Sequence, residues 1–174
     1  GAGGHAGTLH PIPLINEVKK VFDKKIVLSG CLSTGRDIAS AIQMGADIAY
    51  MGTRFINVKE SMADEKYKKM IMESGAEDIV YTAAVSGVNA NFLRPSLEAM
   101  GITEERWSEN KKIDFGTELD ALSEEAKAWK TIWSAGQGVT SIKNNIRTSD
   151  LIGKLKSEFL DAIRSQQELL NVYK

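Results

Sequence analysis

The feature that most limits the fold of this chain is an alternation of helical and extended patterns in its first third. Apolar residues recur at helical spacing over residues 13–22, and a short apolar run, Ile26–Leu28, follows closely. A second helical stripe starts at the capping-box pair Thr34 and Asp37, and a second extended run covers residues 47–51. Helices and strands that alternate over such short loops are typical of a parallel sheet covered by helices. We therefore predict an α/β fold whose first strand is buried on both faces.

The rest of the chain has a different, more helical texture. The sequence predicts a helix that begins after the capping-box pair Ser61 and Asp64 and ends at Gly75, and then a strand over 78–85. A turn and a short helix with Pro95 at its start are predicted over 89–101, followed by a polar loop over 102–117. The last predicted elements are a helix carrying Leu119 to Trp133, a loop over 134–141 and a long helix from about residue 149. The sequence contains no repeat and no convincing linker, only this change of texture near residue 60.

Composition and charge exclude several classes of protein. The chain has 174 residues, of which 43% are hydrophobic, so it can bury a core and is not disordered throughout. Its 22 basic and 23 acidic side chains leave a net charge of −1, which argues against a protein that binds nucleic-acid phosphates. One cysteine and two histidines favour neither a disulfide framework nor a metal centre. We expect no membrane span and no signal peptide, and hence a cytoplasmic protein, because no apolar run approaches about 20 residues.

Glycine follows both predicted strands of the sheet, at Gly30 and at Gly52. The carboxyl ends of parallel strands share one edge, and α/β proteins bind their ligands at that edge. The first glycine loop also leads into a helix amino terminus, whose free N–H groups and dipole favour an anion. We therefore predict that Gly30, Cys31, Gly52 and Thr53 converge on one phosphate site built from backbone donors. The alternative is a pair of ordinary tight turns, which glycine also serves.

His5 is a candidate for proton transfer because it is the only titratable side chain in the opening run GAGGHAG. An imidazole has an ordinary pKa of about 6.5 and can accept or donate a proton at neutral pH. The flanking glycines let the backbone approach a ligand closely. The alternatives are a loop histidine without a role and a remnant of an expression tag. Cys31 has no base near it in the sequence, so its N–H group is of more interest than its thiol.

Four segments extend, in order, across most of the sequence: GAGGHAG, IVLSGCLSTGRDIASAIQMGADIAYMGTRF, SGVNANFLRPSLEAMG and WSAGQG. In this order they resemble the bacterial nitronate monooxygenases, formerly called 2-nitropropane dioxygenases. The FMN-dependent enoyl-acyl-carrier-protein reductases are related flavoproteins that share the glycine–histidine run, the glycine-ended strand and GTRF. The later segments NFLRPSLEAMG and WSAGQG resemble the monooxygenases more closely.

The resemblance implies the carboxyl-terminal part of a (β/α)8 TIM barrel that binds FMN non-covalently. Ile26–Gly30 would be its seventh strand and Ile48–Gly52 its eighth, so residues 1–60 would belong to the barrel. Residues 61–174 would form a mostly helical extension that packs on the barrel. About five or six further strands would precede Gly1, since such a barrel needs about 250 residues. The absence of these strands from the sequence has three possible explanations: a truncation, a clipped product or a partial sequence. We expect the chain alone to be inactive.

The resemblance also implies an oxidoreductase, in which alkyl nitronates or nitroalkanes such as 2-nitropropane are oxidised by molecular oxygen with FMN as cofactor. The implied partners are this small substrate, O2 and the missing amino-terminal half of the barrel, with self-association as an option. The implied site residues are His5 as the catalytic residue and, for FMN, Gly3, Gly4, Gly30, Cys31, Leu32, Tyr50, Met51, Gly52 and Thr53. Many family members have glycine where Cys31 stands, and its backbone donor is kept if its φ is negative. The alternatives are an enoyl-acyl-carrier-protein reductase and a non-catalytic fragment.

Overall fold

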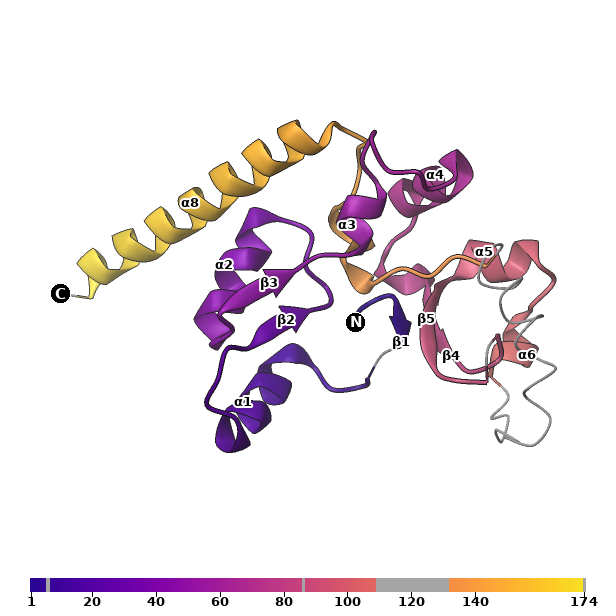
Figure 1. The fold of residues 1–174 in the computed structure, drawn as a ribbon, viewed down its shortest axis with the longest axis horizontal. Coiled ribbons are helices and arrows are strands. Elements are labelled where there is room, and N and C mark those ends of the chain that lie inside the picture. The colour runs from indigo at the N-terminus through magenta and orange to yellow at the C-terminus, as the bar shows by residue number, and fades with distance from the viewer. Residues whose placement is uncertain (6, 86, 109–131, 174) are drawn as a thin grey trace.

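The computed structural model describes residues 1–5, 7–85, 87–108 and 132–173 and has a mixed α/β fold with a helical carboxyl-terminal region (Figure 1). Within these residues the helices are α1 (Pro11–Val21), α2 (Gly35–Met44), α3 (Thr53–Ile56), α4 (Glu65–Glu73), α5 (Arg94–Ala99), α6 (Glu104–Trp107) and α8 (Thr148–Val172), with 3-10 turns η1 (Ala76–Asp78) and η2 (Gln137–Ser141). The strands are β1 (Gly4–His5), β2 (Val27–Ser29), β3 (Ile48–Tyr50), β4 (Ile79–Thr82) and β5 (Ala90–Leu93). They form two separate sheets, a parallel pair β2–β3 and an antiparallel sheet of order β1-β5-β4.

The parallel unit, from α1 to β3, has the predicted order of helix, strand, helix and strand. β2 and β3 pair in parallel along their whole lengths. Leu28 of β2 packs into an apolar cluster with Ile15 of α1 and Ala41 of α2, so the helices cover one face of the pair. Because the side chains of a strand alternate between its two faces, covering one face buries only every second residue.

The other face of the parallel pair is open, so the prediction of a first strand buried on both faces is wrong. Val27 is 54% exposed, and in β3 Ile48 is 52% and Tyr50 61% exposed. Within the described residues, neither β2 nor β3 pairs with a third strand. The residues that the structure describes therefore form no closed sheet.

α2 is fixed at both ends in the way that the sequence predicts. Thr34 and Asp37 form the capping box, and Gly45 ends the helix in the left-handed conformation, with a φ of 105°. α8 lies alongside α2 in Figure 1 and packs closely on its first turn. A β-carbon at Gly35 would lie only 2.1 Å from the carbonyl oxygen of Leu155, so glycine allows the two backbones this close approach.

The start of α4 corrects the second predicted capping box. Asp64 is itself the N-cap, accepting a hydrogen bond from the Lys66 N–H group at 2.7 Å, and is not the third residue of the helix. The Ser61 hydroxyl instead accepts a hydrogen bond from the Ala63 N–H group in the turn before the helix. Serine and aspartate are both good N-caps, and their spacing alone did not decide between them.

The antiparallel sheet contains a strand that the sequence did not predict. β4 lies inside the strand predicted over residues 78–85, and α5 has Pro95 in its first turn, as predicted. Between them, β5 forms where a turn was expected. All four residues of β5 are buried, so its sequence, Ala-Asn-Phe-Leu, shows no alternation that would reveal a strand. β1 pairs with β5, so the amino terminus contacts the region beyond residue 60. The division of the chain into residues 1–60 and residues 61–174 stays a prediction.

The last predicted elements fall partly outside the described residues. The polar loop predicted over 102–117 contains α6, while the helix predicted from Leu119 to Trp133 lies almost wholly in the undescribed range 109–131. The loop predicted over 134–141 ends in η2, and α8 begins where the sequence placed the long helix. None of the helices among the described residues is long and apolar enough to cross a membrane.

Candidate functional site

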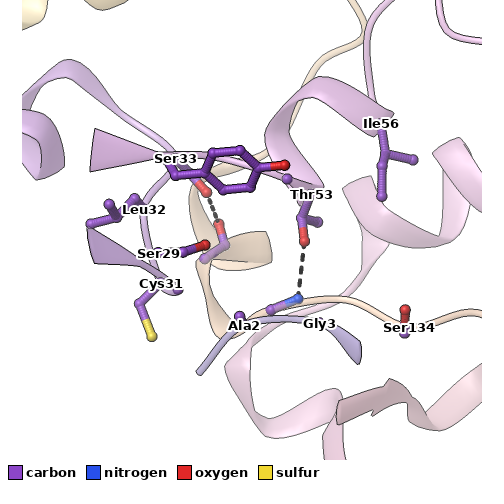
Figure 2. A pocket seen from close by; sticks show the side chains of 14 residues that line it. Ala2, Gly3, Ser29, Cys31, Leu32, Ser33, Thr53, Ile56 and Ser134 are labelled. Atoms are coloured by element: carbon purple, nitrogen blue, oxygen red, sulfur yellow. Dashed lines mark hydrogen bonds between the residues drawn. The ribbon is translucent and has the colours of Figure 1, made fainter. Parts of the chain in front are cut away.

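A pocket of about 170 Å³ opens where β2 and β3 end, at the edge where the ligand site was predicted (Figure 2). Its lining consists of Ala2, Gly3, Ser29, Gly30, Cys31, Leu32, Ser33, Tyr50, Gly52, Thr53, Ile56, Ser134, Gly136 and Gly138. The structure thus brings together seven of the ten predicted site residues, namely Gly3, Gly30, Cys31, Leu32, Tyr50, Gly52 and Thr53.

Three of the predicted site residues lie outside this lining. Met51 packs into the apolar cluster around Leu151 of α8, away from the pocket. Gly4 and His5 form β1, which starts one residue after the pocket residue Gly3 and pairs with β5. The pocket lining therefore tests neither the catalytic role of His5 nor the approach of Gly4 to a flavin, and both stay predictions.

The amino terminus of α2 does not supply the free donors that the sequence suggested. The N–H groups of Ser33 and Thr34 both donate to the Asp37 carboxylate, at 2.8 Å each. The Gly35 N–H group donates to Glu158, which reaches it from α8, also at 2.8 Å. Two carboxylates of the chain itself therefore occupy the place expected for an anion, and this part of the prediction is wrong.

The two glycine loops nevertheless keep unpaired backbone donors at the pocket. Among the described residues, the N–H groups of Cys31, Leu32 and Thr53 have no protein acceptor. All three residues belong to the lining of the pocket. Backbone donors normally find a partner in protein, ligand or water. The pocket therefore has donors suited to an anion, and they come from loops instead of the end of α2.

Cys31 has a positive φ of 60°, whereas a negative φ was the stated condition for keeping its backbone donor. A left-handed backbone costs roughly 1–2 kcal/mol for a residue with a β-carbon. The thiol sulfur lies 3.7 Å from Oε1 of Gln137 and packs against Gly1, where a β-carbon would be only 2.2 Å from it. Glycine is the residue that this backbone conformation favours, so the cysteine is held under strain.

The backbone conformation and the surroundings of Gly52 do not require a glycine at this position. Its φ of −98° and ψ of −70° are open to any residue, and a β-carbon there would meet no atom within 4 Å. Gly30 is different, because its φ is 102° and a β-carbon would lie 3.1 Å from the Ala2 nitrogen. The glycine at position 52 therefore keeps space open beside the pocket, as close approach of a ligand to backbone requires.

Residues 134–138 form a wall of the pocket beside the two glycine loops, and the sequence did not predict them as part of the site. The Thr53 hydroxyl accepts a hydrogen bond from the Gly136 N–H group at 3.0 Å, and the Ser33 hydroxyl donates to the Gly138 carbonyl at 2.8 Å (Figure 2). These contacts join positions 83 and 105 residues apart, which no local pattern reveals. Two signals in the sequence pointed to this segment, its run of small residues and its place in the family resemblance as part of WSAGQG.

Side chains from elements outside the pocket hold its walls in place. The Tyr67 hydroxyl of α4 donates to the Ser134 carbonyl, and its ring stacks on Trp133 with centroids 5.1 Å apart. Burial raises the pKa of Tyr67 to about 12, against the opposing effect of this hydrogen bond, so the phenol remains a donor at neutral pH. From β5, the buried Asn91 amide donates to the Ala2 carbonyl.

The fold and the pocket define an α/β protein with a glycine-lined pocket at the carboxyl edge of a parallel strand pair. The sequence model of one protein family, nitronate monooxygenase, matches residues 1–158, a range that contains every residue of the pocket. The chain therefore belongs to the nitronate monooxygenase family, which confirms the resemblance seen in its sequence.

Individual relatives agree with the family match. The nitronate monooxygenase of Paraburkholderia phytofirmans is 26% identical over 185 aligned positions, which cover 98% of this chain and 50% of that protein. FabK from Thermotoga maritima has a similar fold, with a TM-score of 0.75 at 24% identity over 97% of this chain and 54% of that one. A nitroalkane oxidase from Streptomyces ansochromogenes gives a TM-score of 0.71 at 24% identity, over 95% of this chain and 51% of that one. The chain spans about half the length of the curated relatives it matches.

Proposed function

We propose that this chain is the carboxyl-terminal part of an FMN-dependent enzyme that oxidises alkyl nitronates, or nitroalkanes, with molecular oxygen. Membership of the nitronate monooxygenase family supports oxidoreductase chemistry of this kind. The observation that carries the cofactor assignment is the glycine-lined pocket, with its three unpaired N–H groups at the ends of two parallel strands. The complete activity is proposed for the full-length enzyme that contains this chain.

The pocket fits the phosphate end of FMN and is too small for the whole cofactor. Sites that enclose a complete small ligand hold about 300–1,000 Å³, whereas this pocket holds about 170 Å³. The N–H groups of Cys31, Leu32 and Thr53 would donate to the phosphate, and Gly52 leaves room for its approach. When bound, FMN would supply the redox chemistry, and the protein would position it and exclude competing reactions.

We further propose that β2 and β3 are the seventh and eighth strands of a (β/α)8 barrel that covers their open face. Val27, Ile48 and Tyr50 expose large side chains on this face, and exposed apolar patches mark contact surfaces. The unpaired strand edges are likewise prone to pair with further strands. The partner would be the amino-terminal half of the same enzyme, so the chain alone should be inactive.

His5 is proposed as the residue that moves a proton. A neutral nitroalkane must lose a proton before it is oxidised, whereas a nitronate is already deprotonated. In the full-length enzyme, His5→Asn should therefore lower activity on nitroalkanes by about 10²–10⁴-fold, the usual contribution of a positioned base. Activity on preformed nitronate should fall much less, as measured by steady-state oxygen consumption. An equal loss on both substrates would show that His5 binds or orients the substrate and is not the base.

The proposed function is tested with the purified full-length enzyme. It should show flavin absorbance, release FMN when denatured, and consume oxygen in the presence of propane-2-nitronate. A colourless protein that takes up no added FMN would contradict the cofactor assignment. Reduction of an enoyl thioester by NAD(P)H, without nitronate oxidation, would identify the related enoyl reductase activity instead.

A further inference from the structure

Arg54 is a buried cation that directly follows the pocket residue Thr53 in the chain. It is only 3% exposed, and among the described residues no carboxylate lies within ion-pair distance of it. Burial lowers the pKa of Arg54 from its ordinary value, while the charge of Glu158 acts in the opposite direction. Burying a guanidinium without a carboxylate partner is costly, so the burial of Arg54 calls for an explanation in its other contacts.

The Arg54 guanidinium joins the end of α3 to the segment that follows η2 through hydrogen bonds. Its Nη1 donates to the carbonyl oxygens of Asn57 and Asn144, at 3.4 and 3.3 Å, and its Nη2 donates to the Asn144 side-chain oxygen at 3.0 Å. Beside these contacts, the backbone of Val58 bridges to that of Ile146. A planar guanidinium fork can reach acceptors in two segments at once, which the single ammonium group of lysine does not reproduce.

The same two segments also meet at the pocket. Thr53, at the start of α3, accepts a hydrogen bond from Gly136, which begins the turn that leads through η2 to Asn144. The stretch from Thr53 to Asn57 is therefore joined to the stretch from Gly136 to Asn144 at both of its ends. The Arg54 contacts fix the outer end of this pair, and the Thr53 contact fixes the end that lines the pocket.

We propose that Arg54 is a positioning residue of the phosphate site, which holds the Thr53 wall and the Gly136 wall at a fixed spacing. The proposal rests on the FMN function proposed above. FMN and riboflavin differ only in the phosphate group. A displaced phosphate wall should therefore weaken the binding of FMN and leave the binding of riboflavin unchanged.

The test uses the full-length enzyme, stripped of flavin and then titrated with FMN and with riboflavin while flavin fluorescence is followed. Arg54→Lys keeps the charge and loses the fork. We expect it to raise the Kd for FMN about tenfold while the Kd for riboflavin stays within about twofold, since a lost charge-assisted contact is typically of this size. Arg94→Lys is the matched control, because Arg94 also donates to a backbone carbonyl, that of Glu77, which belongs to neither wall. It should leave both Kd values unchanged.

The outcomes separate this inference from the function on which it rests. Wild-type enzyme that binds FMN no more tightly than riboflavin would overturn the phosphate site itself. A clear FMN preference in the wild type that survives in Arg54→Lys, or an equal loss of both flavins, would overturn only the role of Arg54. If Arg54→Lys does not fold, Asn144→Ala tests the proposal instead. It removes the side-chain oxygen that accepts from Arg54, and Asn144 is an exposed residue, so the fold should tolerate the change. This variant should weaken the binding of FMN and leave the binding of riboflavin unchanged.

Discussion

Among single residues, Cys31 combines a β-carbon with a backbone conformation that glycine adopts more easily. We predict that Cys31→Gly raises the free energy of unfolding of the full-length enzyme by about 1 kcal/mol, because it removes the strain of a positive φ. Denaturant unfolding measures the change. Cys31→Ala is the control, since it removes the thiol and keeps the β-carbon, and it should bring no such gain. A glycine variant less stable than the wild type would contradict the strain argument.

Gly52 offers a second prediction, one that separates ligand binding from stability. Gly52→Ala should change the free energy of unfolding by less than about 0.5 kcal/mol, because the new β-carbon meets no protein atom and φ is unrestricted. It should nevertheless weaken FMN binding, measured by flavin titration, because the methyl group would enter the space in which we propose that the phosphate binds. Gly30→Ala is the contrasting variant and should destabilise the protein, since its φ is 102° and a backbone nitrogen lies 3.1 Å away. Unchanged FMN affinity in Gly52→Ala would count against a phosphate at this position.

At the scale of elements, the contact between α2 and α8 depends on Gly35. We predict that Gly35→Ala lowers the free energy of unfolding by about 1–3 kcal/mol, because its β-carbon would lie 2.1 Å from the Leu155 carbonyl oxygen and the helices would have to separate. Gly153→Ala in α8 is the matched control, since a β-carbon there meets nothing within 4 Å. This second change should instead stabilise the protein by up to about 1 kcal/mol, the helix propensity gained by alanine. Thermal unfolding of both variants distinguishes the two effects, and a Gly35 variant as stable as Gly153→Ala would show that α8 does not constrain α2.

The elements that the sequence predicted correctly are those whose signal is local. The capping box of Thr34 and Asp37 lies within four residues, and the helices and strands around it were predicted in the right order. β5 was missed because its burial depends on β1 and β4, and its own residues carry no alternation. The wall at residues 134–138 was missed for the same reason, because its contacts with Ser33 and Thr53 join distant parts of the chain.

The same limit explains which of the predicted residues the structure brings together at the pocket. Gly30 and Gly52 were found from the ends of two strands, which a local pattern marks. The prediction of free donors at α2 was wrong for two reasons. The nearby Asp37 accepts from the N–H groups of Ser33 and Thr34, and Glu158, more than a hundred residues away, accepts from that of Gly35. Sequence patterns therefore located the edge of the sheet where the pocket lies, while the partners of its polar groups required the folded chain.

At the scale of the whole molecule, the pocket is assembled from segments that lie far apart in the sequence. Its lining comes from residues 2–3, from the loops after β2 and β3, and from residues 134–138. Ser29 of β2 and Tyr50 of β3 line the pocket and are exposed. The pocket therefore adjoins the uncovered face of these two strands. If β2 and β3 belong to the barrel proposed above, further protein would cover this face and enlarge the pocket.

The uncovered face gives a prediction for the full-length enzyme. Val27 is 54% exposed in this chain, but it would be enclosed if further strands of a barrel cover β2 and β3. Val27→Asp should then lower the stability of the full-length enzyme by about 3 kcal/mol or more, because it would bury an unpaired charge. Met62→Asp is the control, since Met62 is 100% exposed, and it should change stability by less than about 0.5 kcal/mol. Chemical unfolding of both variants decides the matter: a Val27 variant as stable as the Met62 variant would mean that this face stays in water and that no barrel closes over it.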